Sequence, residues 1–154
     1  MSRRFVLERT TYIAASLPEV FEFFSAPANL GRITPPRMKF QIVSAPSRGL
    51  REGDRIDYRI RVFGLPARWT TKICMWRENE AFADLQERGP YRFWLHTHTF
   101  RASGEGVEMH DRVEYELPFG WLGRLFGAWL VGRELRAIFD YRAEVIKRIF
   151  VEGR

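Results

Sequence analysis

The sequence predicts an α+β protein in which one strongly curved antiparallel β-sheet, of about six to seven strands, wraps around a long C-terminal helix. Three observations support this fold class. A strand pattern followed by a capped helix opens the chain, segments with strand periodicity follow in hairpin order, and an amphipathic helix closes it. Packing the helix on the sheet buries the apolar face of both elements.

The N-terminal part predicts one strand and two short helices. Residues 5–13 (FVLERTTYI) are rich in β-forming residues, and this pattern stops at Ser16. Ser16 and Glu19 form a capping-box pattern with an early proline, which begins a helix whose buried side includes Phe21. A second short helix is expected over 28–33, because the Thr-Pro-Pro that follows disfavours helix.

The middle of the chain alternates apolar and charged residues, clearest in RIDYRIRVF at 55–63, as in a sheet with one dry face. A four-residue turn after this strand would pair Tyr58 with Thr71, and a second turn at 77–80 would pair Thr71 with Gln86. The inward row of these strands then contains Tyr58, Trp69, Thr71, Ile73, Met75, Phe82, Asp84 and Gln86.

All three histidines lie in the last predicted hairpin, which runs from FWLHTHTF to VEMHDRVEY. A turn at its Ser-Gly-Glu-Gly places His98 opposite Asp111 and His96 opposite Val113. Since alternate residues of the second strand are apolar, we expect His96, His98 and Asp111 to point inward and His110 outward. A register slip of one residue would reverse these directions.

The last third of the chain predicts one long helix, which starts after Pro118 and reaches Phe150. Its first part, residues 121–132, is aromatic nearly all round and contains three glycines, each costing about 1 kcal/mol against alanine. We interpret this part as a lid held by packing, with Trp129 facing the interior. Arg142 lies on the apolar line of the helix, and near the helix end we expect it to snorkel toward solvent.

With these elements in this order, the chain resembles the START-like or SRPBCC superfamily. This helix-grip fold includes the birch pollen allergen type, lipid-transfer START domains and polyketide cyclases. The resemblance covers essentially the whole chain, so a single START-like domain over residues 1–154 is expected. It implies a ligand cavity between the sheet and the long helix. The segments that carry it are YIAASLPEVFEFFSAPANLGRITPP, GDRIDYRIR, RGPYRFWLHTHTF and HDRVEYELPFG.

The residues expected to line this cavity share an inward position, and most of them carry a polar group. Buried polar groups without partners cost a few kcal/mol, so such a wall implies mutual pairing, water or a ligand. We therefore predict binding of a hydrophobic small molecule, lipid-like or aromatic and polycyclic. The predicted ligand-binding residues are Tyr58, Trp69, Thr71, Asp84, Gln86, Trp94, His96, His98, Asp111 and Trp129.

An enzyme is the main alternative to a binding protein. A cyclase or dehydratase would use His98 and Asp111 as its acid/base pair, since a carboxylate that orients an imidazole is half of such a device. We favour binding and assign no catalytic residue otherwise. His96, His98 and Asp111 also have the composition of a metal-binding triad. Residues two apart on a curved strand diverge, however, and no further His or Cys is at hand, so we predict neither a metal nor a cofactor.

Composition limits the partners and the location. The net charge of +6, from 25 basic and 19 acidic residues, raises the possibility of nucleic acid or anionic lipid as a partner. The basic residues are dispersed among acids without a run of five like charges, so we expect no nucleic-acid face. We find no signal peptide or membrane-spanning run and expect no stable membrane insertion. The single Cys74 fits a cytoplasmic protein.

The convex face of the predicted sheet is unusually apolar. The registers place six apolar residues there, where a fully solvated sheet would be polar. This patch predicts a homodimer, or a protein-interaction module as a further alternative function. Its residues are Cys74, Trp76, Ala83, Leu85, Phe93 and Leu95.

Overall fold

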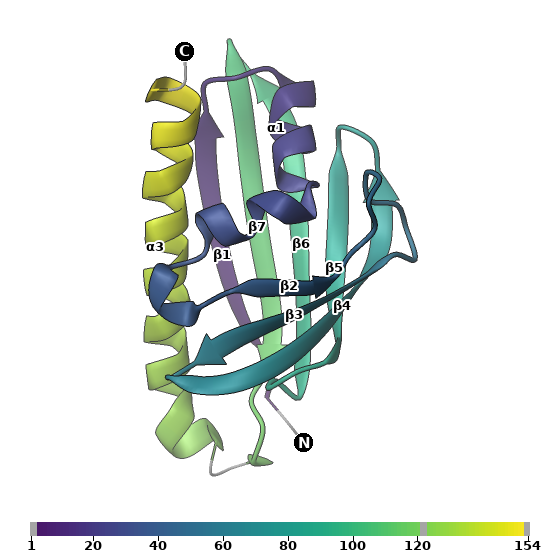
Figure 1. The fold of residues 1–154 in the computed structure, drawn as a ribbon. Coiled ribbons are helices and arrows are strands. Elements are labelled where there is room, and N and C mark those ends of the chain that lie inside the picture. The colour runs from purple at the N-terminus through teal and green to yellow at the C-terminus, as the bar shows by residue number, and fades with distance from the viewer. Residues whose placement is uncertain (1–2, 121–122, 153–154) are drawn as a thin grey trace.

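The structure is a computed structural model, and it describes residues 3–120 and 123–152 (Figure 1). The first half contains β1 (Phe5–Ile13), α1 (Leu17–Phe24), the 3-10 turns η1 (Pro27–Asn29), η2 (Gly31–Ile33) and η3 (Pro36–Met38), β2 (Gln41–Ser44) and β3 (Arg55–Val62). The second half contains β4 (Leu65–Arg77), β5 (Ala81–Arg88), β6 (Phe93–Ser103), β7 (Gly106–Glu116), the π-helical turn η4 (Gly123–Gly127) and α3 (Ala128–Glu152).

The strands form one antiparallel sheet in the order β1-β7-β6-β5-β4-β3-β2. The sheet bends strongly: in Figure 1, β6 and β7 run in nearly the same direction as α3, whereas β2 and β3 run across that direction. The 25-residue α3 runs along one side of this curve, with α1 near its C-terminal end. The α+β fold class predicted from the sequence, with short helices after the first strand, is confirmed.

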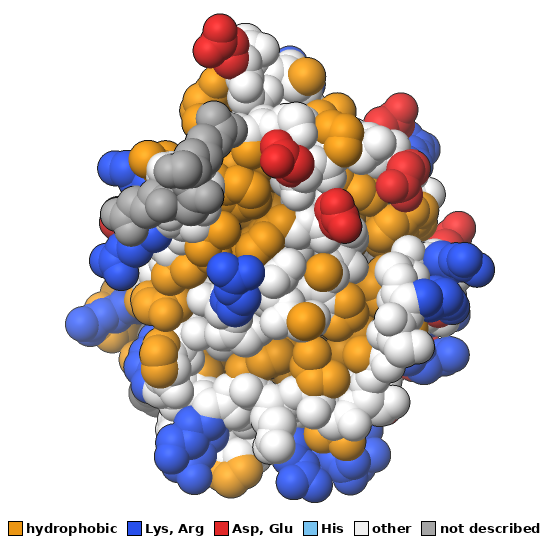
Figure 2. Space-filling model, turned by 45° about the horizontal axis from the view of Figure 1, so that its top comes forward, with side chains coloured by type: hydrophobic (Ala, Val, Ile, Leu, Met, Phe, Trp, Pro, Cys, Tyr) orange, Lys and Arg blue, Asp and Glu red, His pale blue; other side chains and the backbone are white. Residues whose placement is uncertain are grey.

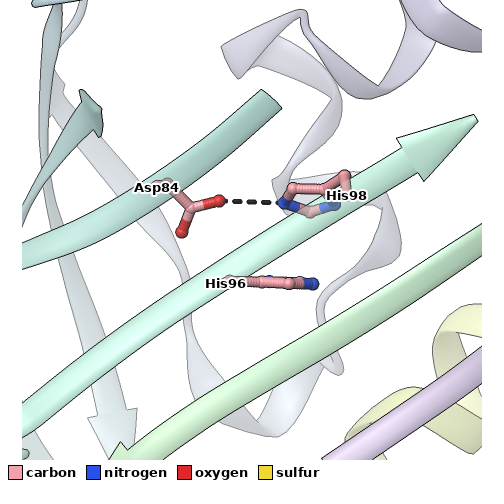
Figure 3. A group of neighbouring side chains, drawn as sticks. All are labelled: Asp84, His96 and His98. Atoms are coloured by element: carbon pink, nitrogen blue, oxygen red, sulfur yellow. Dashed lines mark hydrogen bonds and ion pairs between the residues drawn. The ribbon is translucent and has the colours of Figure 1, made fainter. Parts of the chain in front are cut away.

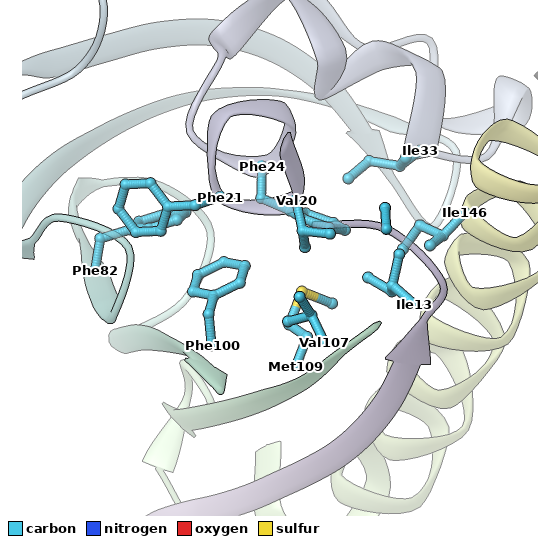
Figure 4. Close-up of a cluster of buried hydrophobic side chains, with 11 residues drawn as sticks. Ile13, Val20, Phe21, Phe24, Ile33, Phe82, Phe100, Val107, Met109 and Ile146 are labelled. Atoms are coloured by element: carbon cyan, nitrogen blue, oxygen red, sulfur yellow. The ribbon is translucent and has the colours of Figure 1, made fainter. Parts of the chain in front are cut away.

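The helix α1 begins as its capping box predicts. The backbone N–H of Glu19 donates to Ser16 Oγ at 3.4 Å, and the N–H of Ser16 donates to Glu19 Oε2 at 3.1 Å. Its apolar side fills one end of the curved sheet, where Phe21 meets Phe82 and Phe100 edge-on (Figure 4). This solid cluster, called here the packed end, contains Ile13, Ala15, Val20, Phe21, Phe24, Ile33, Phe82, Phe100, Val107, Met109 and Ile146.

The hairpin of β6 and β7 has the predicted register, with His98 opposite Asp111 and His96 opposite Val113. Both histidines and Asp111 are buried, as predicted. The half-exposed His110 lies on the other face, 3.5 Å from Glu8. The alternation that the sequence argument requires is therefore present in the strands that matter most for the site.

The predicted register of β3 and β4 is wrong by two residues, because Tyr58 lies opposite Trp69 and not opposite Thr71. The connection is a two-residue turn at Phe63 and Gly64, whose φ angles of 51° and 76° are both left-handed, as in a tight hairpin turn. A phenylalanine rarely takes this conformation, so the sequence favoured a longer turn. A shift of two preserves the faces, and Trp69 and Thr71 still point inward.

A bulge in β4 changes the face of its last residues. Thr71 pairs with Gln86 as predicted, but the register shifts between Ile73 and Met75, and Trp76 then lies opposite Phe82. The predicted positions of Met75 inside and Trp76 on the convex face are therefore wrong. Trp76 packs into the interior, with its ring centroid 5.1 Å from that of Phe21.

The rest of the convex patch is partly covered by the chain itself. Ala83 is buried, and Leu85, Phe93 and Leu95 are half-buried. The Arg4 guanidinium lies 3.9 Å from the centroid of the Phe93 ring. The predicted homodimer contact stays a prediction, and its surface is smaller than the sequence suggests because Trp76 is not part of it.

The predicted lid differs from a continuous helix. The chain forms the π-helical turn η4, and α-helix starts only at Ala128. Gly123 fits because a Cβ there would lie 2.2 Å from the carbonyl oxygen of Pro118. Residues 121–122 of the predicted lid lie outside the described residues. Within the described ranges, no helix combines the length and the apolar character needed to cross a membrane.

On the face shown in Figure 2, charged side chains are spread over several places. In the view of Figure 2, Lys and Arg lie along several edges, and hydrophobic side chains reach the surface across the middle. On β3, Arg55 is neutralised by Glu87, with its Nε 2.7 Å from Glu87 Oε2. The predicted absence of a nucleic-acid face remains a prediction.

Candidate functional site

A cavity of about 150 Å³ lies between the middle of the sheet, α3 and the turns that follow α1. An ion pair between Arg37 of η3 and Glu134 of α3 ties these covering elements together. Most of the wall is apolar or aromatic. The wall is formed by Phe24, Pro27, Leu30, Ile33, Thr34, Phe40, Leu50, Ile56, Tyr58, Ile60, Trp69, Thr71, Ile73, Phe82, Asp84, Tyr91, Trp94, His96, His98, Leu135, Ile138, Phe139 and Arg142.

Aromatic rings form one part of the wall, called here the aromatic wall: Tyr58, Trp69, Tyr91 and Trp94. Tyr58 and Trp69 stack with centroids 5.7 Å apart, and Trp94 meets Trp69 edge-on at 5.2 Å. Burial raises the pKa of Tyr58 well above its usual value, so its hydroxyl stays protonated. The Trp69 indole N–H is buried and has no hydrogen-bond partner among the described residues.

Gln86 does not reach the cavity, because its amide is used by the loop before β6. Its Nε2 donates to the Tyr91 carbonyl oxygen at 2.7 Å, and the Tyr91 N–H donates to its Oε1 at 3.2 Å. A Cβ at Gly89 would lie 2.4 Å from Gln86 Oε1, so a larger residue there would displace the Gln86 amide. The prediction that Gln86 lines the cavity is wrong, and Gln86 instead fixes the loop that carries Tyr91.

Asp84, His96 and His98 form a second part of the wall, with Asp111 behind the two imidazoles. These four residues are called here the polar network. His98 Nε2 and Asp84 Oδ2 are joined by a hydrogen bond of 2.9 Å, drawn as a dashed line in Figure 3. His96 Nε2 lies 2.8 Å from Asp111 Oδ1. Each hydrogen bond joins diagonal neighbours, because Asp84 is directly opposite His96 and Asp111 is directly opposite His98. His98 Nδ1 lies 3.1 Å from Asp111 Oδ1, an ion-pair distance without hydrogen-bond alignment.

The network fixes which groups are charged. Burial favours the neutral acids, but the imidazoles of His96 and His98 outweigh it and hold the pKa of Asp111 well below its usual range. His98 likewise lowers the pKa of Asp84 against burial. Burial opposes charge on His98, yet the two carboxylates raise its pKa. For His96, burial and the charge of His98 lower the pKa. These directions favour two ionised carboxylates, and they favour protonation of His98 over protonation of His96.

The same cluster suits hydrogen-bonded pairs better than a shared metal ion. Potential ligand atoms of Asp84, His96 and His98 lie within 4.8 Å of one another. However, the two imidazoles stack with centroids 3.8 Å apart and a tilt of 30°. Lone pairs lie in the plane of each ring, so those of stacked rings run side by side and do not converge on one ion. The Nε2 of each ring is also engaged by a carboxylate.

Arg142 is half-buried and lines the cavity wall, and its expected snorkelling to solvent stays a prediction. Its guanidinium carbon lies 5.1 Å from the centroid of Phe139, and its charge helps to lower the pKa of Asp84. The buried Nε–H has no hydrogen-bond partner in the described part of the chain. Its position on the apolar line of α3 was the sequence signal for this placement.

Most predicted site residues lie on the cavity wall: Tyr58, Trp69, Thr71, Asp84, Trp94, His96 and His98. Asp111 lies behind the two imidazoles and supports them from outside the lining. Trp129 is 68% exposed and packs against Arg133, so the prediction that it faces the interior is wrong. The sequence argument missed Tyr91, Leu135, Ile138 and Phe139, along with the covering turns, because no strand alternation marks them.

Comparison with known proteins identifies the fold. No family model and no curated protein matches the chain. A START superfamily protein from Mycobacterium smegmatis is similar in structure, with a TM-score of 0.73 and 13% identity, over 97% of this chain and 99% of that one. So is the ginseng major latex-like protein 151 from Panax ginseng (TM-score 0.66, 13% identity, 96% and 98% coverage). Protein Ms6760 from Mycobacterium smegmatis is a third (TM-score 0.70, 15% identity, 97% and 92% coverage). The chain therefore has the START-like, helix-grip fold.

Proposed function

We propose that this protein binds an apolar small molecule in the cavity between the sheet and α3. The observation that carries the proposal is a hollow of about 150 Å³ in an otherwise packed interior. Protein interiors are close-packed, so a hollow of this size is uncommon unless something occupies it. A ligand there would gain contacts with the apolar and aromatic wall.

The size of the cavity narrows the ligand class. A cavity of about 150 Å³ accommodates a benzene-sized ring, whereas sites for drug-sized ligands measure about 300–1,000 Å³. A lipid or a polycyclic molecule therefore requires α3 or the turns after α1 to move outward. We propose a single-ring ligand held against the aromatic wall, which offers stacked and edge-on ring contacts.

Titration with toluene tests this proposal. We expect saturable binding, with a Kd on the order of 0.1–1 mM and a rise in melting temperature. Ile138→Phe places a larger side chain into the cavity wall and should abolish this binding while the protein stays folded. Trp129→Phe, on the exposed side of the same helix, is the matched control and should bind as the wild type does. Toluene binding that persists unchanged in folded Ile138→Phe would contradict the proposal.

A second candidate function, proton transfer, is favoured by one specific observation. Asp111 holds His96 through Nε2, while Nδ1 of this cavity-lining imidazole has no hydrogen bond within the described residues. A base oriented by a carboxylate is the arrangement found in acid/base catalysis. The pair is His96 and Asp111, in place of the predicted His98 and Asp111, because both nitrogens of His98 face carboxylates.

Deuterium exchange at the carbon next to the carbonyl of cyclohexanone tests this alternative. If His96 is a base, NMR should detect exchange in D2O that falls on the order of 100-fold or more in His96→Gln. His110→Gln, on the outer face of the neighbouring strand, is the control and should keep the full rate. Exchange at the uncatalysed rate in the wild type would exclude this function for ring ketones.

A further inference from the structure

Two buried donors in the cavity wall and one ring nitrogen of His96 have no hydrogen-bond partner within the described residues. The Trp69 indole Nε1–H and the Arg142 Nε–H are buried donors without an acceptor. His96 supplies the third atom: its Nε2 donates to Asp111, so Nδ1 carries the lone pair of the neutral ring. Buried donors without an acceptor are unfavourable, and a ligand with complementary groups would pair them.

The acceptor and one donor lie close together around Phe139. The His96 ring centroid is 5.7 Å from that of Phe139, and the Arg142 guanidinium carbon is 5.1 Å from it. Asp84 also lies on the wall and keeps 21% of its side-chain surface accessible, so its carboxylate is a second acceptor near His96. The second donor, Trp69, belongs to the aromatic wall. A ring between these groups meets donors and acceptors at once.

Ionisable groups of both signs already face one another around the cavity. The lowered pKa values of Asp84 and Asp111 favour two carboxylates. They are offset by the imidazole of His98, whose raised pKa favours the protonated form, and by the guanidinium of Arg142 on the cavity wall. A charged ligand would add a charge without a partner, which is unfavourable away from water. A neutral ligand with hydrogen-bonding groups avoids this cost.

On the basis of the proposed function, we propose that the cavity selects a neutral single-ring molecule that carries both a hydroxyl group and a carbonyl oxygen. The hydroxyl donates to His96 Nδ1, with Asp84 as the neighbouring acceptor. The carbonyl oxygen accepts from the N–H of Arg142 or of Trp69. The ring fills the space that Ile138 and the aromatic wall enclose.

Five ring probes of similar size separate these features by calorimetric titration of the wild type at neutral pH. They are methylcyclohexane, cyclohexanone, cyclohexanol, 4-hydroxycyclohexanone and 4-hydroxycyclohexanecarboxylate. We expect 4-hydroxycyclohexanone to bind about 10-fold more tightly than either singly substituted probe, because each neutral hydrogen bond to an otherwise unpaired group contributes about that factor. The carboxylate should bind more weakly than 4-hydroxycyclohexanone.

Two variants assign the contacts. Arg142→Met keeps the apolar stem. It should weaken the binding of 4-hydroxycyclohexanone about 10-fold and leave the binding of methylcyclohexane unchanged. His96→Phe should remove the preference for 4-hydroxycyclohexanone over cyclohexanone. The wild-type series alone decides the proposal if either variant fails to fold. Methylcyclohexane that does not bind would overturn the proposed function itself. If methylcyclohexane binds as tightly as 4-hydroxycyclohexanone, only the inference about polar groups is overturned. If the carboxylate binds more tightly than 4-hydroxycyclohexanone, the claim that the cavity selects a neutral ligand is overturned.

Discussion

The packed end and the cavity differ sharply although the same strands build both. On β6, Phe100 belongs to the packed end, whereas His98 and His96, at the next inward positions, line the cavity. On β5, Phe82 belongs to the packed end and also borders the cavity beside Asp84, and its ring stacks on His98 with centroids 4.3 Å apart. One step of two residues thus leads from dry packing to an ionic wall.

The cause lies in what covers the sheet. Over the packed end, α1 contributes its buried side, and Phe21 is only 1% exposed. Over the middle of the sheet the cover is the short turns and one stretch of α3, which leave the cavity open. Inward direction on a strand therefore decides which residues are enclosed, and the covering elements decide whether the enclosed space is filled.

Truncation in the packed end should have the largest effect on stability. Phe21→Ala removes a ring that contacts Trp76, Phe82 and Phe100, and should lower the free energy of unfolding by about 3–5 kcal/mol. Ile138→Ala, which only enlarges an existing hollow, should cost less than Phe21→Ala. Urea denaturation of both variants measures this difference, and equal losses would contradict the contrast between the two regions.

Removal of the shared carboxylate should come next. Asp111→Asn leaves His96 and His98 without the charge that both contact, and should cost about 2–4 kcal/mol at neutral pH. Glu108→Gln, which breaks an exposed pair with Arg101, should change stability by less than about 0.5 kcal/mol. The same denaturation experiment compares them, and an equally small change in Asp111→Asn would show that the network adds no stability.

The polar network should also make stability depend on pH. The pKa values of Asp84 and Asp111 are lowered from 3.8, so their contribution is present above that pH and is lost as the pH falls through the folded-state values. His98, whose pKa is raised from 6.5, contributes below that pH and loses its contribution as the pH rises. Between pH 7 and pH 2, the free energy of unfolding of Asp84→Asn should therefore decrease less steeply with falling pH than that of the wild type. Parallel curves would contradict this assignment of charges.

A change outside both regions should have the smallest effect. Trp129→Ser removes a 68% exposed ring, so stability should change by less than about 0.5 kcal/mol and toluene should bind with unchanged affinity. Thermal denaturation with and without toluene checks both quantities. Lost binding in this variant would restore the view of Trp129 as part of the site.

The sequence predicts the inward direction of most site residues because alternation along β5, β6 and β7 is regular. It misses features that depend on single backbone angles or on rotamers. The left-handed backbone conformation of Phe63 allows a shorter β3–β4 turn, and the bulge after Ile73 turns Trp76 toward the interior.

The sequence also could not predict which histidine forms a hydrogen bond with which aspartate in the site. The pairs His96–Asp111 and His98–Asp84 run diagonally, whereas the register alone suggests that His98 and Asp111 pair directly. Gln86 and Arg142 show the same limit. The Gln86 side chain forms a hydrogen bond with the loop at Tyr91, and the Arg142 side chain lines the cavity.

NMR contacts between bound toluene and the side-chain methyl groups test the central claim most directly. If the hollow middle of the sheet is the binding site, nuclear Overhauser effects should join the toluene ring to Ile60, Leu135 and Ile138, which line the cavity. Effects only to the exposed Leu125 and Leu130, or none at saturating toluene, would contradict the account.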